Sequence, residues 1–272
     1  MLYLNQTYDL LIGGYYLGNS SWNKKHTEID NCFKIYQLTE GEVFIYNKEQ
    51  RFNLQKNKLY FINGNMIDYQ HCSSSFSLCW LHFIPKDLII YQGLLSLPTV
   101  VELPIEEINL QDIMPSLENL LTSNMISNWQ FSLDILNTQT FLQRITLMVF
   151  AQHPTNDLFV SFEAQRIEPA IHYINQCYRE TIKLEELANK CCMSPNYFHK
   201  IFKTTLNLTP ANYQTLLRMN TALQLLADER QTIKSIAYEL GFTDDAHFCR
   251  SFKKYYGIPP GEYKKQRGNI LL

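Results

Sequence analysis

Small, polar and cationic side chains recur at helical spacing between residues 244 and 256. The apolar residues of this stretch fall on one helix face: Phe248, Phe252 and Tyr255. The opposite face carries a different set: Ala246, Cys249, Arg250 and Lys253. An apolar back with a small, cationic front is typical of a helix that inserts into the major groove of DNA. Arg250 is the strongest candidate base reader, because a guanidinium can bond guanine O6 and N7 together, and Ala246 suits a thymine methyl group.

A short helix and a tight turn precede this stretch and are expected to hold it. The apolar positions of the short helix recur three and four residues apart: Ile233, Ile236, Ala237 and Leu240. Gly241 then supplies the left-handed residue that ends it. Asp244 is the expected N-cap of the next helix, and Gly257 is expected to close that helix before two prolines. The sequence therefore predicts a helix-turn-helix unit.

The same unit occurs earlier in the chain, at residues 181–213. Leu187 lies 49 residues before Ile236, and Phe198 lies 50 residues before Phe248. The one-residue difference falls in the turn, where a change of length is tolerated best. Asn207 stands where the second copy has Gly257, and asparagine is the next-best left-handed residue. An internal repeat of this kind carries more weight than either motif alone.

Residues 237–263 resemble the signature of the AraC/XylS family of bacterial transcription regulators. The matching positions include Ala237, Gly241, Phe242, Asp244 and the Phe248 to Tyr263 pattern F-x-R-x-F-K-x-x-x-G-x-x-P-x-x-Y. The likeness is specific over about the last hundred residues and weaker before them. It implies that the groove-facing sites of the first unit are Asn196, His199 and Lys200, and those of the second are Ala246, Cys249 and Arg250.

These side chains suit base edges. Asparagine pairs with adenine, and lysine or histidine donates to guanine. Three lysines follow the readers and are expected to contact phosphate: Lys203, Lys253 and Lys254. Asp244 and Asp245 repel phosphates, so weaker binding by the second unit is expected. Without the repeat, ordinary solvated helix charges would be the better interpretation.

Composition bounds the rest. A chain of 272 residues with 46% hydrophobic and 13% aromatic content fits two domains with real cores. Residues 161–272 hold 15 Lys and Arg against 11 Asp and Glu, whereas residues 1–160 hold 9 against 15. The excess of positive charge thus lies with the helix pairs, as phosphate binding requires. No cationic leader or membrane-spanning run is visible, and seven cysteines without a C-x-x-C pair favour reduced thiols in a cytoplasmic protein.

Residues 1 to about 100 read as short strands: 9–16, 33–38, 42–46, 58–62 and 77–84, punctuated by glycine and asparagine. Many short antiparallel strands predict a closed barrel or a jelly roll of the cupin type. Helical periodicity follows at 105–122 and 128–151. Leu136 and Leu147 form an extra apolar stripe on the latter, so we expect either a homodimer contact or packing against the barrel.

The predicted fold class is therefore α+β. A cupin-like β-barrel with two flanking helices (1–151) precedes a polar connection (152–165) and an all-α domain with two helix-turn-helix units (166–272). Within the all-α domain, residues 210–226 are expected to form a linking helix of roughly 25 Å, capped by Thr209. Successive major grooves are about 34 Å apart, so one rigid helix plus the units that it joins gives a suitable separation.

The barrel offers a candidate effector site. Trp80 and His82 alternate onto one strand face, with Tyr36 and Tyr46 on other strands. Such a set could stack on and bond a small polar ligand such as a sugar, although a satisfied core histidine beside a space-filling Trp is an equal alternative. No H-x-H motif occurs, so neither a metal nor another cofactor is predicted.

The leading hypothesis is a sequence-specific regulator of promoter DNA, with a barrel that senses an effector or dimerises, and with RNA polymerase as a candidate partner. The rivals are a cupin metalloenzyme fused to a DNA-binding tail, an acceptor of DNA alkyl groups, and a regulator whose barrel only dimerises. The first lacks a visible metal motif, and the second would need clustered zinc-binding cysteines that Cys32, Cys72 and Cys79 do not form.

Overall fold

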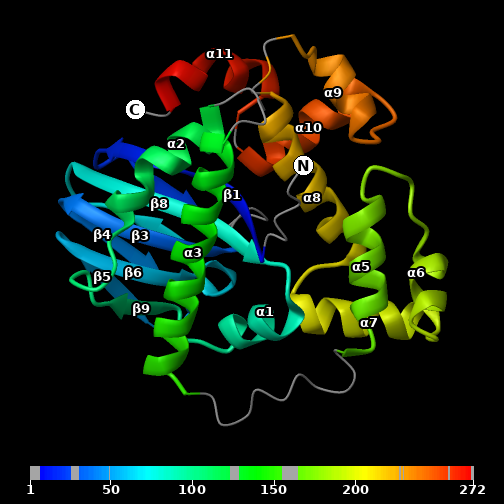
Figure 1. Cartoon of the computed structure of the whole chain (residues 1–272), viewed down its shortest axis with the longest axis horizontal. Helices are drawn as coiled ribbons and strands as arrows, with labels where there is room; N and C mark the ends of the chain where they lie inside the picture. The colour runs from blue at the N-terminus through cyan, green and yellow to red at the C-terminus, as the bar shows by residue number, and fades with distance from the viewer. Residues whose placement is uncertain are drawn as a thin grey trace. The chain divides into compact units, whose positions relative to one another are not determined.

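The computed structural model describes residues 7–25, 31–48, 50–122, 129–154, 165–226, 228, 230–256 and 258–270. The chain divides into two compact units. One comprises Met1–Asp157 together with Gly268–Leu272, and the other comprises Leu158–Arg267. Figure 1 shows the strands gathered in the first unit and the helix pairs in the second.

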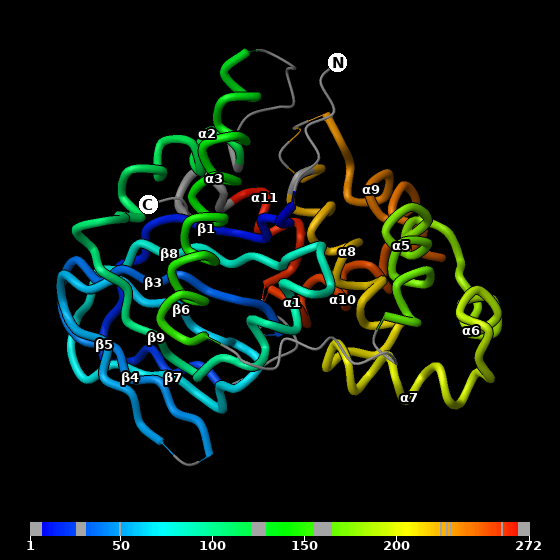
Figure 2. Tube along the Cα trace, turned by 60° about the horizontal axis from the view of Figure 1, so that its bottom comes forward, coloured from blue at the N-terminus to red at the C-terminus, as the bar shows by residue number. Residues whose placement is uncertain are grey.

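The first unit contains two antiparallel sheets. The five-stranded sheet has the order β1-β8-β3-β6-β9, and the four-stranded sheet has the order β2-β7-β4-β5. The strands are β1 (Tyr8–Gly18), β2 (Asn23–Lys25), β3 (Phe33–Glu40), β4 (Glu42–Tyr46), β5 (Arg51–Gln55), β6 (Lys58–Asn63), β7 (Tyr69–His71), β8 (Phe76–Pro85) and β9 (Val100–Leu103). Figure 2 follows this trace from a second side. The expected α+β class is confirmed, although the strands of the described residues form two sheets and do not close into a barrel.

Strand alternation gives the five-stranded sheet two different faces. One face contributes to a core that it shares with the four-stranded sheet, made of Tyr36, Leu38, Val43, Ile45, Leu54, Tyr60, Ile62, Ile67, Cys72, Phe76 and Leu78. We call this cluster the inter-sheet core. The other face carries Phe33, Phe61 and Phe83, and the Phe33 ring contacts the other two. Most residues on both faces of β3 and β8 are thus buried, and β3 buries Lys34 and Gln37 as well as its apolar residues.

Helices cover the second face. They are α1 (Leu88–Leu95), α2 (Met114–Thr122) and α3 (Trp129–Gln152). The Tyr8 hydroxyl on β1 donates to Thr146 Oγ1 of α3 at 2.9 Å. The Gln139 amide of α3 bonds both backbone groups of Tyr8, at 3.0 and 2.9 Å, and so satisfies part of an edge strand. The predicted helix at 128–151 is confirmed, and a 3-10 turn (Leu110–Ile113) and α2 occupy the later part of the one predicted at 105–122.

All five predicted strands are present, and the additional elements are the short strands β2, β5, β7 and β9 with helix α1. Residues 155–164, the bulk of the predicted connection, lie outside the described residues. The domain boundary therefore stays a prediction.

The second unit consists of helices. They are α5 (Glu168–Cys177), α6 (Leu184–Lys190), α7 (Pro195–Leu206), α8 (Pro210–Leu225), α9 (Ile233–Glu239), α10 (Asp245–Tyr256) and α11 (Pro260–Ile270). The pairs α6–α7 and α9–α10 are the two predicted helix-turn-helix units, and α8 joins them. Four phenylalanines at repeat-related positions have no exposed area: Phe198, Phe202, Phe248 and Phe252. Among the helices of the described residues, none is long and apolar enough to cross a membrane.

Candidate nucleic-acid interface

Helix α7 presents a polar face on the side opposite the aromatic residues that anchor it. Asn196, Lys200 and Lys203 are exposed and His199 is partly exposed, while Phe198 and Phe202 are buried on the other side. The helix begins with Ser194 at the N-cap and Pro195 at the first position, although the Ser194 side chain makes no capping hydrogen bond. It ends at Asn207, whose φ of 54° confirms the predicted left-handed C-cap.

Helix α10 repeats this arrangement. Ala246, Arg250, Lys253 and Lys254 are exposed and Cys249 is partly exposed. The Asp244 carboxylate accepts a hydrogen bond from the His247 backbone N–H at 2.6 Å, which confirms the predicted N-cap. That same bond lowers the pKa of Asp244, so the carboxylate stays charged at the start of the helix. Burial raises the pKa of the Cys249 thiol, so this side chain is a neutral, weak hydrogen-bond donor. The predicted cap Gly257 lies outside the described residues.

All nine predicted DNA-contacting residues thus lie on the two helices, on faces turned away from the aromatic core. Arg250 and Lys200 occupy matching places, as do Lys253 and Lys203. Tyr197 is a neighbour that the sequence did not single out: it is 37% exposed and borders the polar face of α7. An exposed aromatic ring beside cationic residues suits stacking or packing against a sugar, and its place one residue after Asn196 was the available signal.

The turn of each unit contains a residue with positive φ. Gly241, at 77°, confirms the predicted left-handed glycine. Its counterpart in the first unit is Cys192, 49 residues earlier, which is exposed and has a φ of 53°. A left-handed conformation costs a residue with a Cβ about 1–2 kcal/mol. The first turn is therefore strained where the second is not.

We expect Cys192→Gly to raise the free energy of unfolding of the C-terminal unit by about 0.5–1 kcal/mol, because relief of this strain exceeds the entropy that glycine adds to the unfolded chain. Urea denaturation followed by far-UV circular dichroism measures the change. Cys192→Ala is the matched control: it removes the thiol but keeps the Cβ, and should give no gain. Equal stabilisation by both variants would show that the thiol, not the backbone, is the source.

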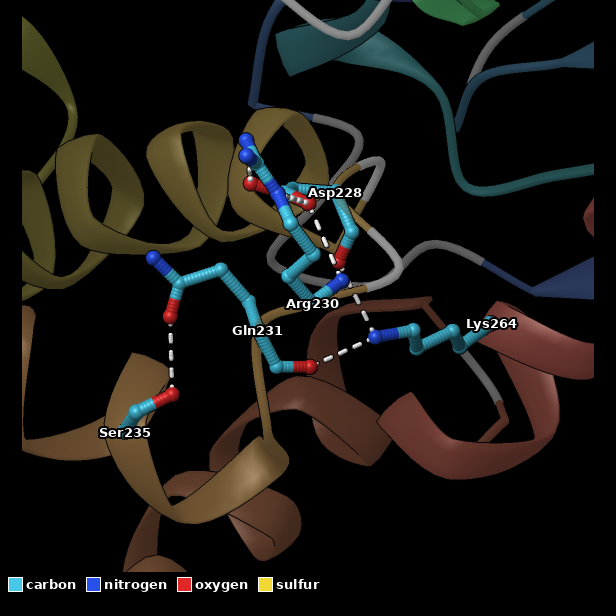
Figure 3. A network of polar contacts seen from close by, with 5 residues as sticks. All are labelled: Asp228, Arg230, Gln231, Ser235 and Lys264. Carbon is cyan, nitrogen blue, oxygen red and sulfur yellow. Dashed lines mark hydrogen bonds and ion pairs between the residues drawn. The ribbon is translucent and has the colours of Figure 1, made fainter.

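Further contacts hold the second helix-turn-helix unit in place (Figure 3). Lys264 of α11 donates to the backbone carbonyls of Asp228 and Gln231, at 3.0 and 2.5 Å, in the segment between α8 and α9. Gln231 in turn accepts from the Ser235 hydroxyl at 2.8 Å. Ser235 also belongs to a capping box with Thr232 at the start of α9, which the sequence analysis missed because serine replaces the usual Glu or Gln. A serine three residues after a threonine was the sequence signal for this capping box.

In the N-terminal β unit, the structure brings together three of the four predicted effector residues. Tyr36 and Trp80 are direct partners across β3 and β8. The Tyr36 hydroxyl lies 3.4 Å from His82 Nε2, and the Trp80 and His82 rings are 4.8 Å apart. Trp80 packs against the inter-sheet core. Tyr36, Trp80 and His82 therefore form one polar-aromatic group on the inner face.

Tyr46 does not join them. It alternates with Ile45, a member of the inter-sheet core, and so lies on the opposite face of the four-stranded sheet. There its ring stacks on Tyr69 at 4.2 Å and its hydroxyl bonds His71 Nε2 at 3.0 Å. Sequence spacing within β4 gave this alternation, but only the pairing of strands shows which face is inside.

Gln70 is an inner-face residue that the sequence analysis did not single out. It lies opposite Ile45 across β4 and β7 and is 5% exposed. Its Oε1 and the Trp80 Nε1 are both buried without a hydrogen-bond partner among the described residues. An unpaired buried polar atom is destabilising by about 1–3 kcal/mol. A ligand that bonded the Trp80 donor and the Gln70 acceptor would therefore remove this penalty. Among the described residues, no group of three or more His, Cys, Asp or Glu is placed to hold a metal ion.

Comparison with known proteins agrees with these features. A family model described as a helix-turn-helix domain matches residues 187–266, from within α6 to α11, and so covers both reading helices. A protein of Haemophilus influenzae described as an uncharacterized HTH-type transcriptional regulator is 26% identical over 271 residues, covering 90% of each chain. The lactose operon transcription activator of Staphylococcus xylosus is 24% identical over 233 residues, covering 85% of this chain and 77% of that protein. The chain is therefore a DNA-binding transcription regulator of the helix-turn-helix class.

The solved structure of unsaturated fatty acid bound ToxT from Vibrio cholerae is similar over 97% of each chain, with a TM-score of 0.58 and 14% identity. At that identity the likeness concerns the fold, which places an antiparallel β unit before a helical one. The duplicated signature and the helix-turn-helix match together confirm the resemblance of this regulator to the AraC/XylS family.

Proposed function

We propose that this regulator binds promoter DNA by placing α7 and α10 in successive major grooves. The observation that carries the proposal is the repetition itself: two helices present matching polar faces, each backed by two fully buried phenylalanines. The proposed base readers of the first helix-turn-helix unit are Asn196, His199 and Lys200. Those of the second helix-turn-helix unit are Ala246, Cys249 and Arg250. Lys203, Lys253 and Lys254 are the proposed phosphate contacts.

The joining helix has a suitable length. The 16 residues of α8 span about 24 Å, and the widths of the two units add to the separation of the reading helices. Grooves on one side of a duplex repeat about every 34 Å. One copy of the chain would thus recognise two short boxes about one helical turn apart.

Selection of random duplexes by the full-length chain tests this function. We expect two enriched boxes, centred about 10–10.5 base pairs apart, and an affinity that falls steeply as salt is raised. A single box would contradict the use of both units. No enrichment over competitor DNA at moderate salt would contradict the proposal as a whole.

We further propose that the N-terminal β unit binds a small polar effector on the inner face of its sheets. Trp80 Nε1 and Gln70 Oε1, which have no hydrogen-bond partner in the described part of the chain, support this, because one ligand hydroxyl group could accept from the first and another could donate to the second. Tyr36 and His82 supply a stacking and hydrogen-bonding neighbour. A sugar has this chemistry, and the relative from Staphylococcus xylosus is named for the lactose operon. Tyr46, on the outer face, is left out of the proposed site.

A thermal-shift screen of neutral mono- and disaccharides tests the effector site. A ligand that binds only the folded state at 100 times its Kd adds about 2.7 kcal/mol of stability. We expect Trp80→Phe, which keeps an aromatic ring but removes the N–H donor, to weaken binding of the effective sugar up to about tenfold. Tyr46→Phe, which removes a hydroxyl group from the outer face of the four-stranded sheet, is the matched control and should leave binding of the sugar unchanged. A screen without any stabilising member would favour a domain that only dimerises.

The homodimer also stays a proposal. Trp129, Leu136 and Leu147 are 76%, 42% and 69% exposed. Their spacings of 7 and 11 residues place them along one line of α3. Such a stripe would be buried by a second copy of the chain, with RNA polymerase as a separate proposed partner of the DNA-bound form.

A further inference from the structure

Arg218, in the middle of α8, binds three backbone carbonyls. Its Nε donates to Tyr178 O at 2.6 Å and one terminal nitrogen donates to Glu180 O at 2.7 Å. The other terminal nitrogen donates to Gly241 O at 3.1 Å. Burial lowers the pKa of the guanidinium, but an arginine remains charged at any physiological pH. The bonds are therefore charge-assisted and stronger than those between neutral groups.

The three carbonyls belong to different parts of the DNA-binding unit. Tyr178 and Glu180 lie between α5 and α6, where the chain enters the first helix-turn-helix unit. Gly241 is the left-handed residue in the turn between α9 and α10, four residues before the second reading helix begins. One planar side chain thus links the entrance of the first unit to the turn of the second.

Neighbouring contacts strengthen this link. Gln214, one helical turn before Arg218 on α8, donates to Tyr178 O and Glu180 O at 2.9 and 2.7 Å. The Arg218 guanidinium also lies 5.3 Å from the centre of the Phe242 ring. A Cβ placed on Gly241 would come within 1.7 Å of Arg179 O, so the second turn touches the backbone of the first segment directly. We call Tyr178, Glu180, Gln214, Arg218 and Gly241 the Arg218 junction.

We propose that Arg218 is a positioning residue for DNA recognition, which sets the distance between α7 and α10 and thereby the one spacing of operator boxes that the protein accepts. This inference rests on the proposed function, in which both helices read DNA together. Arg218 itself need not touch DNA. It acts by preventing the two units from moving apart or rotating about α8.

A rigid junction has a measurable consequence. One inserted base pair moves the second box by about 3.4 Å along the duplex and turns it about the axis. A protein with fixed reading helices then loses base contacts in one box, and the loss of even one correct contact weakens binding about tenfold. A protein with a loosened junction can follow the displaced box and loses less.

The test uses the full-length chain and a set of duplexes that carry the two selected boxes at the selected spacing, at one base pair less, and at one and two more. For the wild type we expect affinity to fall about tenfold or more on either side of the optimum. Arg218→Met keeps the length of the aliphatic stem and removes the three donors. We expect it to bind the optimum more weakly but to vary less than about threefold across the spacings, a fraction of one base contact. Arg230→Met is the matched control, because Arg230 is exposed in the α8–α9 connection and its side chain bonds only Asp228 among the described residues.

Circular dichroism and urea denaturation establish that each variant is folded. If Arg218→Met does not fold, Arg218→Lys decides, because a single ammonium group can replace only part of the fork and should broaden the spacing preference partially. A variant that weakens binding equally at every spacing, with the optimum unchanged, would overturn the proposal and leave Arg218 a purely stabilising residue. Failure of the wild type to bind any two-box duplex would instead refute the proposed function.

Discussion

Replacing Gly241 by alanine will destabilise the C-terminal unit by about 2–5 kcal/mol. The left-handed conformation, at a φ of 77°, penalises any Cβ by about 1–2 kcal/mol. The added methyl would also lie 1.7 Å from Arg179 O and 2.8 Å from Arg179 C. Both are backbone atoms that no rotamer change can move aside, so overpacking adds about 1–3 kcal/mol.

The distribution of tryptophans allows this effect to be located. Trp22, Trp80 and Trp129 are the three tryptophans of the chain, and all belong to the first unit. Tryptophan fluorescence therefore follows unfolding of the β unit, while helical circular dichroism follows mainly the second unit. For Gly241→Ala we expect the dichroism midpoint to fall by about 1–2 M urea, with the fluorescence midpoint nearly unchanged.

Gly261→Ala is the control for Gly241→Ala. Gly261 lies in α11, and a Cβ there would meet nothing within 4 Å. Alanine in a helix is favoured over glycine by up to about 1 kcal/mol, so this variant should be neutral or slightly more stable. If Gly241→Ala were as stable as Gly261→Ala, the tight approach of the second turn to Arg179 would be wrong.

Replacing Arg250 by alanine will lower affinity for the selected operator about 5- to 150-fold, equivalent to about 1–3 kcal/mol, and will relax the preference at one base pair. The reason is the loss of a two-pronged donor to guanine from the exposed face of α10. Lys200→Ala is expected to do the same in the other box. Titrations against the operator and against each single-base variant measure both the loss and its position.

Lys253→Ala should behave differently. A phosphate contact carries no sequence information, so we expect binding to weaken alike on all duplexes and the slope of log affinity against log salt to fall by about 1. Arg230→Ala again serves as the control, since Arg230 is outside both reading helices. The assignment of readers would be wrong if Arg250→Ala, Lys200→Ala and Lys253→Ala all changed binding to every duplex by the same factor.

The sequence predicted best what is encoded locally. The helix pairs follow from apolar spacing, and Asp244, Asn207 and Gly241 occupy the caps and turn that their chemistry favours. Cys192 was missed because cysteine has no preference for positive φ. Its alignment with Gly241 in the repeat was the only sign, and it required trusting the repeat over the residue type.

What depends on distant pairing could not be predicted. Strand alternation separates Tyr46 from Ile45, but the inner face is defined by strands that lie far away in sequence, such as β3 and β8. Gln70 is buried on a three-residue strand that is too short to show a pattern. Arg218 bonds residues 23 to 40 positions away, and its guanidinium gives no hint of three carbonyl partners.

The choice of carbonyl groups at the joint has an evolutionary consequence. A main-chain oxygen persists whatever amino acid occupies the position, so Tyr178 and Glu180 can be exchanged in a descendant lineage without removing a partner of Arg218. Residues on the outer surfaces of α7 and α10 are likewise free to drift toward new promoters. A duplicated gene can therefore evolve a regulator with a different base preference that still requires the ancestral distance between its two recognition boxes.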